Sequence, residues 1–404
     1  MNGTSSAPAR LLNVFVYEPY PLAKVFGNLR TLLYILEGAS SRSVRCVVAA
    51  PFESELADRV RAFGADWLIV EPPDAINRYG GQVLREPMSQ RVRALVELVG
   101  YNLRVRRLLQ DRKIDLVYCN SIRSLLTVGL AAKLAKVPLV WYVKGALENR
   151  VLDRLGFFMA DRIIYFCEAN RDDRYPVLVR WFSRKIDIVR IGLDLAALDA
   201  IQAPTAPMPA VAEGELSVAY LGQLYAPKGV HFLVDAFAQV AKTFPKAKLY
   251  LIGDPGIAEY AHYVDELRAR VDALGIADRV VFTGWRQDAL AIAKQMTILV
   301  HPSMSEGFGR AVLEAMALGK PVIACAVGGL REAIQDGQNG FLVPPGDTEA
   351  IAARLRLLLS NAALRARMGR AARETVERDY QISDKLDELC DIWHDIVEHT
   401  VAPA

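Results

Sequence analysis

The chain has 404 residues, of which 52% are hydrophobic, and its 49 basic and 46 acidic residues give a formal net charge of +3. This length and composition exclude a disordered chain and favour two or three well-filled globular domains. The five cysteines are widely spaced without a C-x-x-C pair, and no apolar run reaches the ~18 residues of a membrane span, so we expect buried, reduced thiols and no transmembrane helix.

In the first half, short apolar runs alternate with helical stretches, which is typical of a parallel α/β sheet. We predict strands at residues 11–17, 44–49, 67–70, 115–119, 139–143, 162–166 and 186–189. The alternation breaks where Pro204, Pro207 and Pro209 stand among many alanines. The sequence therefore predicts an N-terminal domain over residues 1–200 and a linker over 201–215.

The alternation resumes in the second half, where we predict strands at residues 216–221, 248–252, 280–283, 298–301, 322–326 and 340–343. From Thr348 onward the chain is nearly all helical. We assign residues 216–382 to a second domain and 383–404 to a C-terminal helix. Both domains have the pattern of doubly wound Rossmann-like sheets, which bind ligands at the carboxyl ends of their strands.

The most informative segment runs from Glu306 to Ala324, where two glutamates are separated by seven residues. Helix formers follow Gly309, and a glycine and a proline then end the helix, so Glu314 lies on a largely apolar helix. A carboxylate there is costly unless it is hydrogen-bonded. Glu306 lies in the loop before the helix, where backbone N–H groups favour anions. This layout fits a ligand with hydroxyls at both ends and phosphate between, as in a nucleoside-diphosphate sugar.

This segment closely resembles the nucleotide-sugar motif of glycosyltransferase family 4, whose enzymes have the GT-B fold. The resemblance is specific from about residue 216 to 347 and topological before that. It implies two Rossmann-like domains facing each other across a cleft, with the last helix crossing back to the first domain. It also implies transfer of a hexose-type unit from a nucleotide sugar with retention of configuration, and no cofactor. The acceptor would be a glycan, a lipid-linked molecule or a small molecule, as in polysaccharide biosynthesis.

The resemblance also assigns roles to residues of the second domain. Glu306 would hold sugar hydroxyls, Glu314 the ribose hydroxyls and Lys228 the phosphates, so Glu306 and Lys228 are the expected catalytic residues. Gln223 stands where the family usually has arginine, which replaces one cation by a neutral donor. The remaining donor-binding candidates are Gly222, Trp285, Gly307, Phe308 and Gly309, with Trp285 expected beside the base or, alternatively, in the core.

Three positions of the first domain are further candidates, Gly27 for the donor and Asn120 and Lys144 for the acceptor, and Gly27 and Lys144 depart from the family pattern. Gly27 is the one glycine present where the family usually has a pair near the donor phosphates. Asn120 ends one predicted strand, and Lys144 follows the next strand, where His-Gly is common. Lys144 has two interpretations: contact with phosphate or an anionic acceptor, and a structural salt bridge.

We expect no metal site, because the chain has no D-x-D triplet and its five histidines show no metal-ligand spacing. A non-catalytic nucleotide-sugar-binding protein of the same fold is the alternative function, motivated by Gln223 and Lys144. A Rossmann dehydrogenase is poorly supported, since no G-x-G-x-x-G follows either first strand. Nucleic acid is not an expected partner.

Charge is distributed unevenly: residues 1–200 have a net charge of +8 and the remainder −5. A basic first half suggests an anionic partner. The segment from Arg91 to Leu109 places apolar residues on one helical face with arginines around it. Two structures would show this pattern: an interfacial helix resting on anionic lipid, and an ordinary helix packed against the core. Trp181 and Phe182, beside three basic residues, form a weaker candidate for lipid contact.

Export is not expected, because the apolar run near the N-terminus is too short for a signal peptide. We expect a cytoplasmic protein, with peripheral contact at the inner face of the membrane as one alternative.

Overall fold

The computed structural model describes residues 10–19, 27–74, 87–144, 150–172, 175–204, 214–256 and 258–401. The chain divides into two compact units: unit 1 comprises Met1–Gly192 and Ser383–Ala404, and unit 2 comprises Leu193–Ile382. Most of the predicted linker, residues 205–213, lies outside the described residues. The boundary falls after Gly192, whereas the sequence predicted that the first domain extends to residue 200. The next helix, α9 (Leu195–Asp199), belongs to unit 2, where Arg373 donates two hydrogen bonds to the Asp199 carboxylate.

Unit 1 contains a seven-stranded parallel sheet in the order β3-β2-β1-β4-β5-β6-β7. Its strands are β1 (Leu12–Tyr17), β2 (Val44–Ala50), β3 (Asp66–Ile69), β4 (Leu116–Cys119), β5 (Leu139–Val143), β6 (Arg162–Tyr165) and β7 (Ile186–Ile188). Its helices are α1 (Gly27–Ser40), α2 (Glu55–Ala62), α4 (Met88–Asp111), α5 (Ile122–Ala135), α6 (Arg150–Met159), α7 (Glu168–Asp172) and α8 (Pro176–Trp181), with a short 3-10 turn at Ser183–Lys185. The strand order reverses between β1 and β4, which is where sheets of this kind bind ligands.

Unit 2 contains a six-stranded parallel sheet in the order β10-β9-β8-β11-β12-β13. Its strands are β8 (Leu216–Leu221), β9 (Ala247–Ile252), β10 (Val280–Gly284), β11 (Ile298–His301), β12 (Val322–Cys325) and β13 (Phe341–Val343). Its further helices are α10 (Val230–Ala241), α11 (Ala261–Ala273), α12 (Ala289–Gln295), α13 (Arg310–Ala317), α14 (Leu330–Ala333), α15 (Thr348–Ser360) and α16 (Ala362–Asp379), and 3-10 turns lie at Ala226–Lys228, Ala258–Tyr260 and Ala277–Arg279. The order reverses between β8 and β11.

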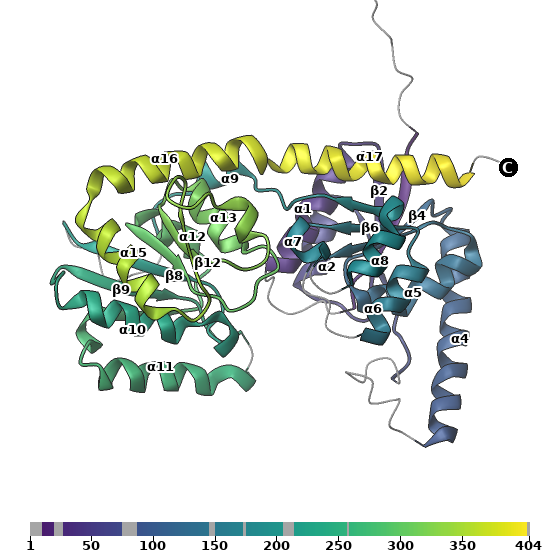
Figure 1. Cartoon of the computed structure of the whole chain (residues 1–404). Coiled ribbons are helices and arrows are strands. Elements are labelled where there is room, and N and C mark those ends of the chain that lie inside the picture. The colour runs from purple at the N-terminus through teal and green to yellow at the C-terminus, as the bar shows by residue number, and fades with distance from the viewer. Residues whose placement is uncertain are drawn as a thin grey trace, which may run out of the picture. The chain divides into compact units, whose positions relative to one another are not determined.

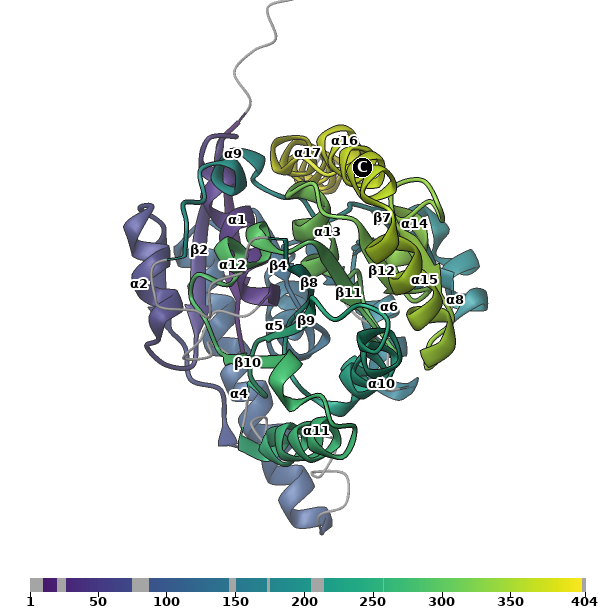
Figure 2. The same cartoon turned by 90° about the vertical axis from the view of Figure 1, so that its left-hand side faces the viewer.

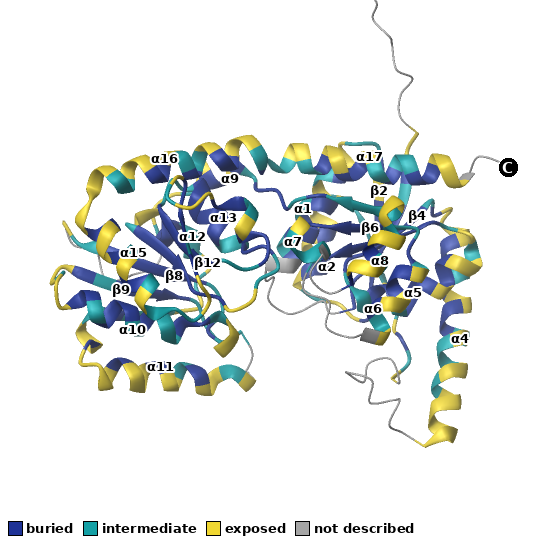
Figure 3. Ribbon diagram, viewed as in Figure 1, coloured by how far each residue is buried: buried dark blue, intermediate teal, exposed yellow. Residues whose placement is uncertain are grey.

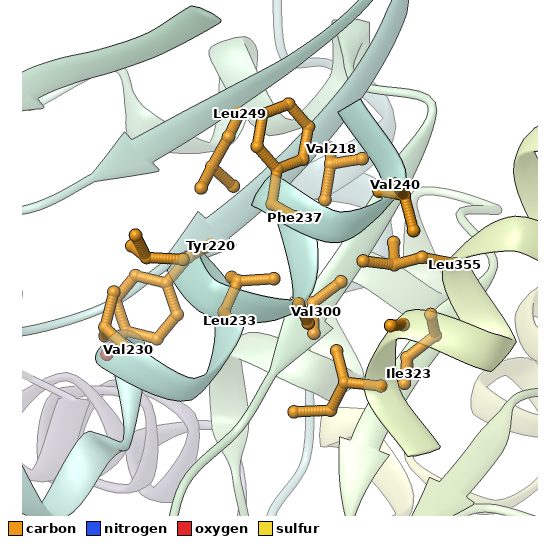
Figure 4. Close-up of a cluster of buried hydrophobic side chains, with 14 of the residues drawn as sticks. Val218, Tyr220, Val230, Leu233, Phe237, Val240, Leu249, Val300, Ile323 and Leu355 are labelled. Carbon is orange, nitrogen blue, oxygen red and sulfur yellow. The ribbon is translucent and has the colours of Figure 1, made fainter. Parts of the chain in front are cut away.

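Helices cover both faces of each sheet (Figures 1 and 2), so the strands are buried on both sides and read as continuous apolar runs. In unit 2, alternate residues of the strands meet α10, α11 and α15 in one cluster of buried side chains. Figure 4 shows part of this cluster, with Val218 of β8, Val300 of β11 and Ile323 of β12 facing Phe237 of α10 and Leu355 of α15.

The thirteen strands observed in the two sheets are those that the sequence predicted, each within one residue at either end. The prediction succeeded because a strand buried on both faces has an unbroken apolar run that local composition reveals. Figure 3 shows the strands as mostly buried in both units. All five cysteines are buried and unpaired, as expected.

After α16 the chain returns to unit 1 as α17 (Ile382–Val401). Trp393 is fully buried with its ring 5.2 Å from that of Tyr118 in β4. Arg162 in β6 donates a hydrogen bond of 2.6 Å to Asp395. A side chain at Gly38 in α1 would meet Leu386, so this glycine allows α17 to lie close to α1.

Helix α4 packs on the sheet only through its C-terminal part, where Tyr101, Val105 and Leu109 are buried in the unit 1 core. The apolar side chains of its N-terminal part are exposed, and these are Met88, Val92, Leu95, Val96 and Val99, followed by Leu103. The core-packed interpretation of this apolar face is therefore wrong, because periodicity shows that a face is apolar but does not show what covers it. Among the described residues, no helix has both the length and the apolar character needed to cross a membrane.

Candidate functional site

The candidate site of unit 2 lies where β8 and β11 end, at the reversal of strand order. The loop after β8 contains Gly222, Gln223, Lys228 and Gly229. Gly229 has φ +65, and a side chain there would meet the backbone oxygen of Pro302 at 2.2 Å. Only glycine suits this position, because it combines a left-handed conformation with close approach of the next loop. The loop after β8 is thereby held against the loop after β11.

The loop after β11 runs from Pro302 to Gly309 and is fixed from two sides. The Met304 amide donates a hydrogen bond of 2.9 Å to the Pro227 oxygen. On the other side, Gly328 has φ +48, and a side chain there would meet the Glu306 backbone oxygen at 2.1 Å. The Gly329 amide donates to the Gly307 oxygen at 3.0 Å. Three loops, which follow β8, β11 and β12, are thus locked around Glu306.

A cluster of three charged or polar side chains, of which His301 is buried and the other two are partly buried, forms at this point. Glu306 Oε1 accepts hydrogen bonds from Lys228 Nζ at 2.5 Å and from His301 Nε2 at 2.6 Å. The exposed fractions of the three side chains are 11% for Glu306, 17% for Lys228 and 3% for His301. The sequence predicted a role for Lys228 and Glu306 separately, and the structure brings the two into direct contact.

The electrostatics of this cluster favour the ionised carboxylate. Burial raises the pKa of Glu306, but His301 and Lys228 together outweigh burial and lower the pKa to about 2. A partly buried Lys228 beside an ionised Glu306 is paired before any ligand arrives. An incoming anion would therefore compete with Glu306 for the ammonium group.

His301 is a site residue that the sequence analysis did not identify. It ends β11, and its ring lies parallel to that of Tyr220 at 6.0 Å between centroids and 11° between planes. Its Nδ1 is buried without a hydrogen-bond partner among the described residues. Its Nε2 donates to Glu306, so the ring fixes the orientation of the carboxylate. Its place at the carboxyl end of a predicted strand was the available signal, whereas the histidines had been considered only as metal ligands.

Helix α13 carries the second glutamate. Gly309 (φ +82) precedes the helix, and no side chain caps its first turn. Glu314 is buried, and its Oε1 accepts a hydrogen bond of 2.9 Å from Arg310 Nε one turn earlier. Arg310, which the sequence analysis treated only as a helix former, provides the hydrogen bond that a carboxylate on an apolar helix requires.

The other predicted donor-binding residues of unit 2 lie in different surroundings. The backbone oxygen of Gln223 accepts a hydrogen bond from Tyr220 Oη. The side-chain amide of Gln223 lies against Gly256, where an added Cβ would be 2.3 Å from Gln223 Nε2. Trp285 follows β10 and is 50% exposed. Phe308 is buried, with its ring 5.6 Å from that of Tyr380. The contacts of Phe308 are those of a packing residue that fixes the loop.

In unit 1 the predicted residues follow neighbouring strands. Asn120 comes directly after β4 and Lys144 directly after β5, with the Lys144 ammonium 5.3 Å from the Tyr142 ring centre. Gly27 begins α1, and the loop before it, residues 20–26, lies outside the described residues. The sequence analysis missed Glu18, which follows β1 and accepts a hydrogen bond of 3.3 Å from Asn120 Nδ2.

Glu18 differs electrostatically from Glu306. Burial raises the pKa of Glu18, the hydrogen bond from Asn120 and the charge of Lys144 oppose this only in part, and the result is a pKa of about 7. The Asn120 Oδ1 atom is buried without a hydrogen-bond partner among the described residues. Glu18, Asn120 and Lys144 therefore form a polar group at the reversal of strand order in unit 1. Across the described part of the chain, no three His, Cys, Asp or Glu residues are grouped as a metal site would require.

Comparison with known proteins identifies relatives of part of the chain. Residues 207–375 match the family described as Glycosyl transferases group 1. D-inositol 3-phosphate glycosyltransferase from Mycobacterium marinum is 35% identical over 237 residues, which are 56% of this chain and 47% of the relative. N-acetyl-alpha-D-glucosaminyl L-malate synthase from Bacillus anthracis is 32% identical over 188 residues, which are 46% of this chain and 47% of the relative. The chain thus spans about half the length of these curated relatives.

Solved structures extend the comparison to the whole fold. The crystal structure of HepE from Anabaena in complex with UDP and glucose superposes with a TM-score of 0.74 at 21% sequence identity and covers 94% of this chain and 98% of that one. Unit 2 holds residues 207–375 and with them the Lys228–Glu306–His301 cluster. The chain therefore has the GT-B fold, and the part of unit 2 over residues 207–375 matches the family described as Glycosyl transferases group 1.

Proposed function

We propose that this protein transfers a sugar from a nucleoside-diphosphate sugar to an acceptor hydroxyl, with retention of configuration and without a metal. The observation that carries the proposal is the buried contact of Lys228, Glu306 and His301 at the reversal of strand order, next to a helix whose N-terminus has no side-chain cap. A cation and a helix N-terminus both stabilise phosphate. A carboxylate held in place beside them can accept hydrogen bonds from a sugar.

In this proposal the donor lies along the loops after β8 and β11. Lys228 turns from Glu306 to the diphosphate, and Glu306, still held by His301, accepts hydrogen bonds from the sugar. Glu314 binds the ribose hydroxyls, with Arg310 fixing the carboxylate. Because HepE was crystallised with UDP and glucose, uridine diphosphate and UDP-glucose are the first probes.

The reaction breaks the bond between the anomeric carbon and the phosphate oxygen, and its electron pair goes to the leaving diphosphate. The acceptor oxygen then bonds to the same face of the anomeric carbon and gives its proton to a phosphate oxygen. Lys228 stabilises the negative charge that develops on the diphosphate, which is where preorganised electrostatics lower the barrier. Glu306 and His301 stay fixed during the step, and their roles are to orient the sugar and the carboxylate respectively.

The acceptor side is assigned to unit 1, where Asn120 and Lys144 follow β4 and β5. Support comes from their place at the carboxyl ends of adjacent strands and from the net charge of +8 over residues 1–200. A glycan, a lipid-linked molecule and a small molecule are the candidate acceptors.

A transfer assay with UDP-, GDP- and ADP-sugars, supplied with and without candidate acceptors, tests the proposal. Release of the nucleoside diphosphate together with formation of an α-linked product from an α-linked donor is the expected result. Tight nucleotide-sugar binding without turnover across the panel would instead favour the non-catalytic alternative. Chelation with EDTA should leave turnover unchanged, and a loss that magnesium or manganese restores would contradict metal independence.

We also propose peripheral contact with an anionic membrane. The exposed apolar side chains of the N-terminal part of α4 support it, because an exposed apolar stripe beside Arg93, Arg104 and Arg107 is typical of an interfacial helix. Co-sedimentation with vesicles should show binding to anionic and not to neutral lipid. A double variant, Val92→Ser with Val96→Ser, should reduce that binding if α4 makes the contact.

A further inference from the structure

A second exposed apolar surface of unit 1 lies on α6 and α8. Helix α6 exposes Val151, Leu155 and Phe158, which recur at the spacing of one helical face, while its opposite face buries Phe157 in the core. Phe158 is 58% exposed, a large fraction for a phenylalanine in a helix whose other face is already in the core.

Helix α8 adds Val177 and Trp181, each 74% exposed. The two helices are separate in sequence but are joined by Phe182, whose ring lies 5.1 Å from that of Phe158 and 6.1 Å from that of Trp181. The five side chains therefore belong to one surface, the α6–α8 patch, which consists of Val151, Leu155, Phe158, Val177 and Trp181. Sequence periodicity could not join them, because tertiary packing alone places α6 beside α8.

The exposed charged side chains described on α6 and α8 themselves are basic. Arg154, Arg180 and Arg184 are exposed and form no ion pair in the described part of the chain. The Lys185 ammonium lies 5.2 Å from the Phe182 ring centre. Within the described residues of α6 and α8, Asp153 is the single acidic side chain, and it is buried with a hydrogen bond of 3.0 Å from Tyr175 Oη.

An apolar patch on a folded domain marks a surface that is covered by a partner. A protein partner would ordinarily be matched by charges of both signs, whereas the exposed charged side chains described on α6 and α8 are basic. The exposed Glu168 of the neighbouring helix α7 is already paired with Arg171 at 2.6 Å. Tryptophan and arginine side by side suit the boundary of a bilayer, where the ring meets the acyl region and the cation meets the phosphates. Each basic residue near an anionic surface adds to the attraction.

We infer that the α6–α8 patch binds the surface of an anionic phospholipid membrane, with Trp181 and Phe158 inserted at the interface and Arg154, Arg180 and Arg184 on the lipid phosphates. The inference rests on the proposed membrane contact and adds to α4 a second lipid-binding surface in the same unit. The patch lies in the unit that carries the proposed acceptor side, so lipid contact would bring that unit to a membrane-borne acceptor.

The test uses full-length protein and vesicles of phosphatidylcholine alone or mixed with phosphatidylglycerol. Wild type should bind the mixed vesicles, and binding should weaken as salt rises. A Trp181→Ser, Phe158→Ser variant should lose at least tenfold in affinity, and so should an Arg154→Gln, Arg180→Gln, Arg184→Gln variant. Leu274→Ser, at an exposed leucine of unit 2, is the matched control and should bind as wild type does. Trp181→Phe should retain most of the binding, and it separates loss of contact from loss of folding.

Equal binding of the Trp181→Ser, Phe158→Ser variant and wild type would overturn the inference, even if the α4 variant fails to bind. Equal binding to neutral and mixed vesicles would overturn the anionic-lipid assignment. If wild type sediments as a dimer that Trp181→Ser converts to monomer, the patch covers a second copy and the lipid assignment is wrong. Transfer to a soluble acceptor, measured on the same variants, should not change, so failure of the membrane inference is distinguishable from failure of the proposed transfer reaction.

Discussion

Two buried glutamates, one in each unit, occupy comparable places and have opposite electrostatics. Glu18 follows β1 in unit 1, and Glu306 lies in the loop after β11 in unit 2, both at the reversal of strand order in a parallel sheet. Burial raises the pKa of each carboxyl. The pKa of Glu18 is about 7 because the hydrogen bond from Asn120 and the charge of Lys144 lower it by less than burial raises it. The pKa of Glu306 is about 2 because His301 and Lys228 contact the carboxylate directly and outweigh burial.

The difference teaches that position in the fold does not decide the charge of a carboxyl; its immediate partners do. Unit 2 holds an ionised carboxylate that contacts a lysine and a histidine directly. Unit 1 holds a carboxyl that changes its charge near neutral pH. The following predictions test this contrast, from the largest expected effect to the smallest.

Glu18→Gln should stabilise unit 1 at alkaline pH. The folded pKa of Glu18, about 7, lies above its ordinary value of 4.5, so the folded state keeps a proton that the unfolded state loses. Stability should therefore fall as pH rises from about 4.5 to 7, by on the order of 3 kcal/mol. Thermal unfolding at pH 5 and pH 8 should show this fall in wild type and not in Glu18→Gln. Glu37→Gln, at an exposed glutamate of α1, is the control.

Tyr17, Tyr118 and Lys144 also interact electrostatically with Glu18, and the tyrosines stay neutral over this range because burial raises the pKa of each. A Glu18→Gln variant no more stable than wild type at pH 8 would show that the buried carboxyl carries no penalty. For Glu306 the sign is opposite: its stabilising contribution is complete above about pH 4.5 and is lost as pH falls towards 2.

Lys228→Ala should lower kcat/KM by about a hundredfold, the scale observed when one preorganised group facing developing charge is removed. The loss should lie mostly in kcat, because the charge on the diphosphate grows as the glycosidic bond breaks. Steady-state kinetics with the active donor measures it, and Lys242→Ala, at an exposed lysine just after α10, is the matched control. A change below about threefold, which is less than 1 kcal/mol, would remove Lys228 from the site.

Glu306→Gln and Glu314→Ala should separate the sugar end of the donor from the ribose end. Glu306→Gln should lower kcat by roughly 30-fold without weakening binding of free nucleoside diphosphate, since it also releases Lys228 from its partner. Glu314→Ala should weaken donor and free diphosphate alike, with most of the loss in KM. Calorimetry of UDP binding and steady-state kinetics measure both. If Glu306→Gln loses as much nucleotide affinity as Glu314→Ala, the two ends are assigned the wrong way round.

His301→Leu should lower kcat by about tenfold, the scale of one lost hydrogen bond, and leave affinity for UDP unchanged. His301→Gln should restore most of the activity, because its amide can donate from nearly the position of Nε2. In a Glu306→Gln background, His301→Leu should lower kcat by a smaller factor than it does in the wild type, since both changes act through the same carboxyl group. Additive losses, or no rescue by glutamine, would mean that His301 acts through packing on Tyr220 instead.

Much of the fold and part of the site followed from local sequence. The strands were predictable because buried parallel strands are apolar runs bounded by loops. Glu306, Lys228 and Glu314 could be singled out because their glycines, helix and strand lie within short stretches of chain. Their roles stay predictions, as do those of Gly27, Asn120, Lys144 and Trp285, and the residues 20–26 before Gly27 lie outside the described part.

The sequence by itself determined the two sheets, their helices and the polar residues at the ends of the strands, because these depend on neighbours within a few positions. Tertiary structure decided which of those residues meet. Lys228 contacts Glu306 across 78 positions, and Asn120 contacts Glu18 across 102. Tertiary structure also decided that the apolar face of α4 stays exposed and that the Phe182 ring contacts the rings of both Phe158 and Trp181. The physical reason is that a side chain's charge and burial depend on whatever the fold packs against it, and strand order brings together loops that the sequence keeps far apart.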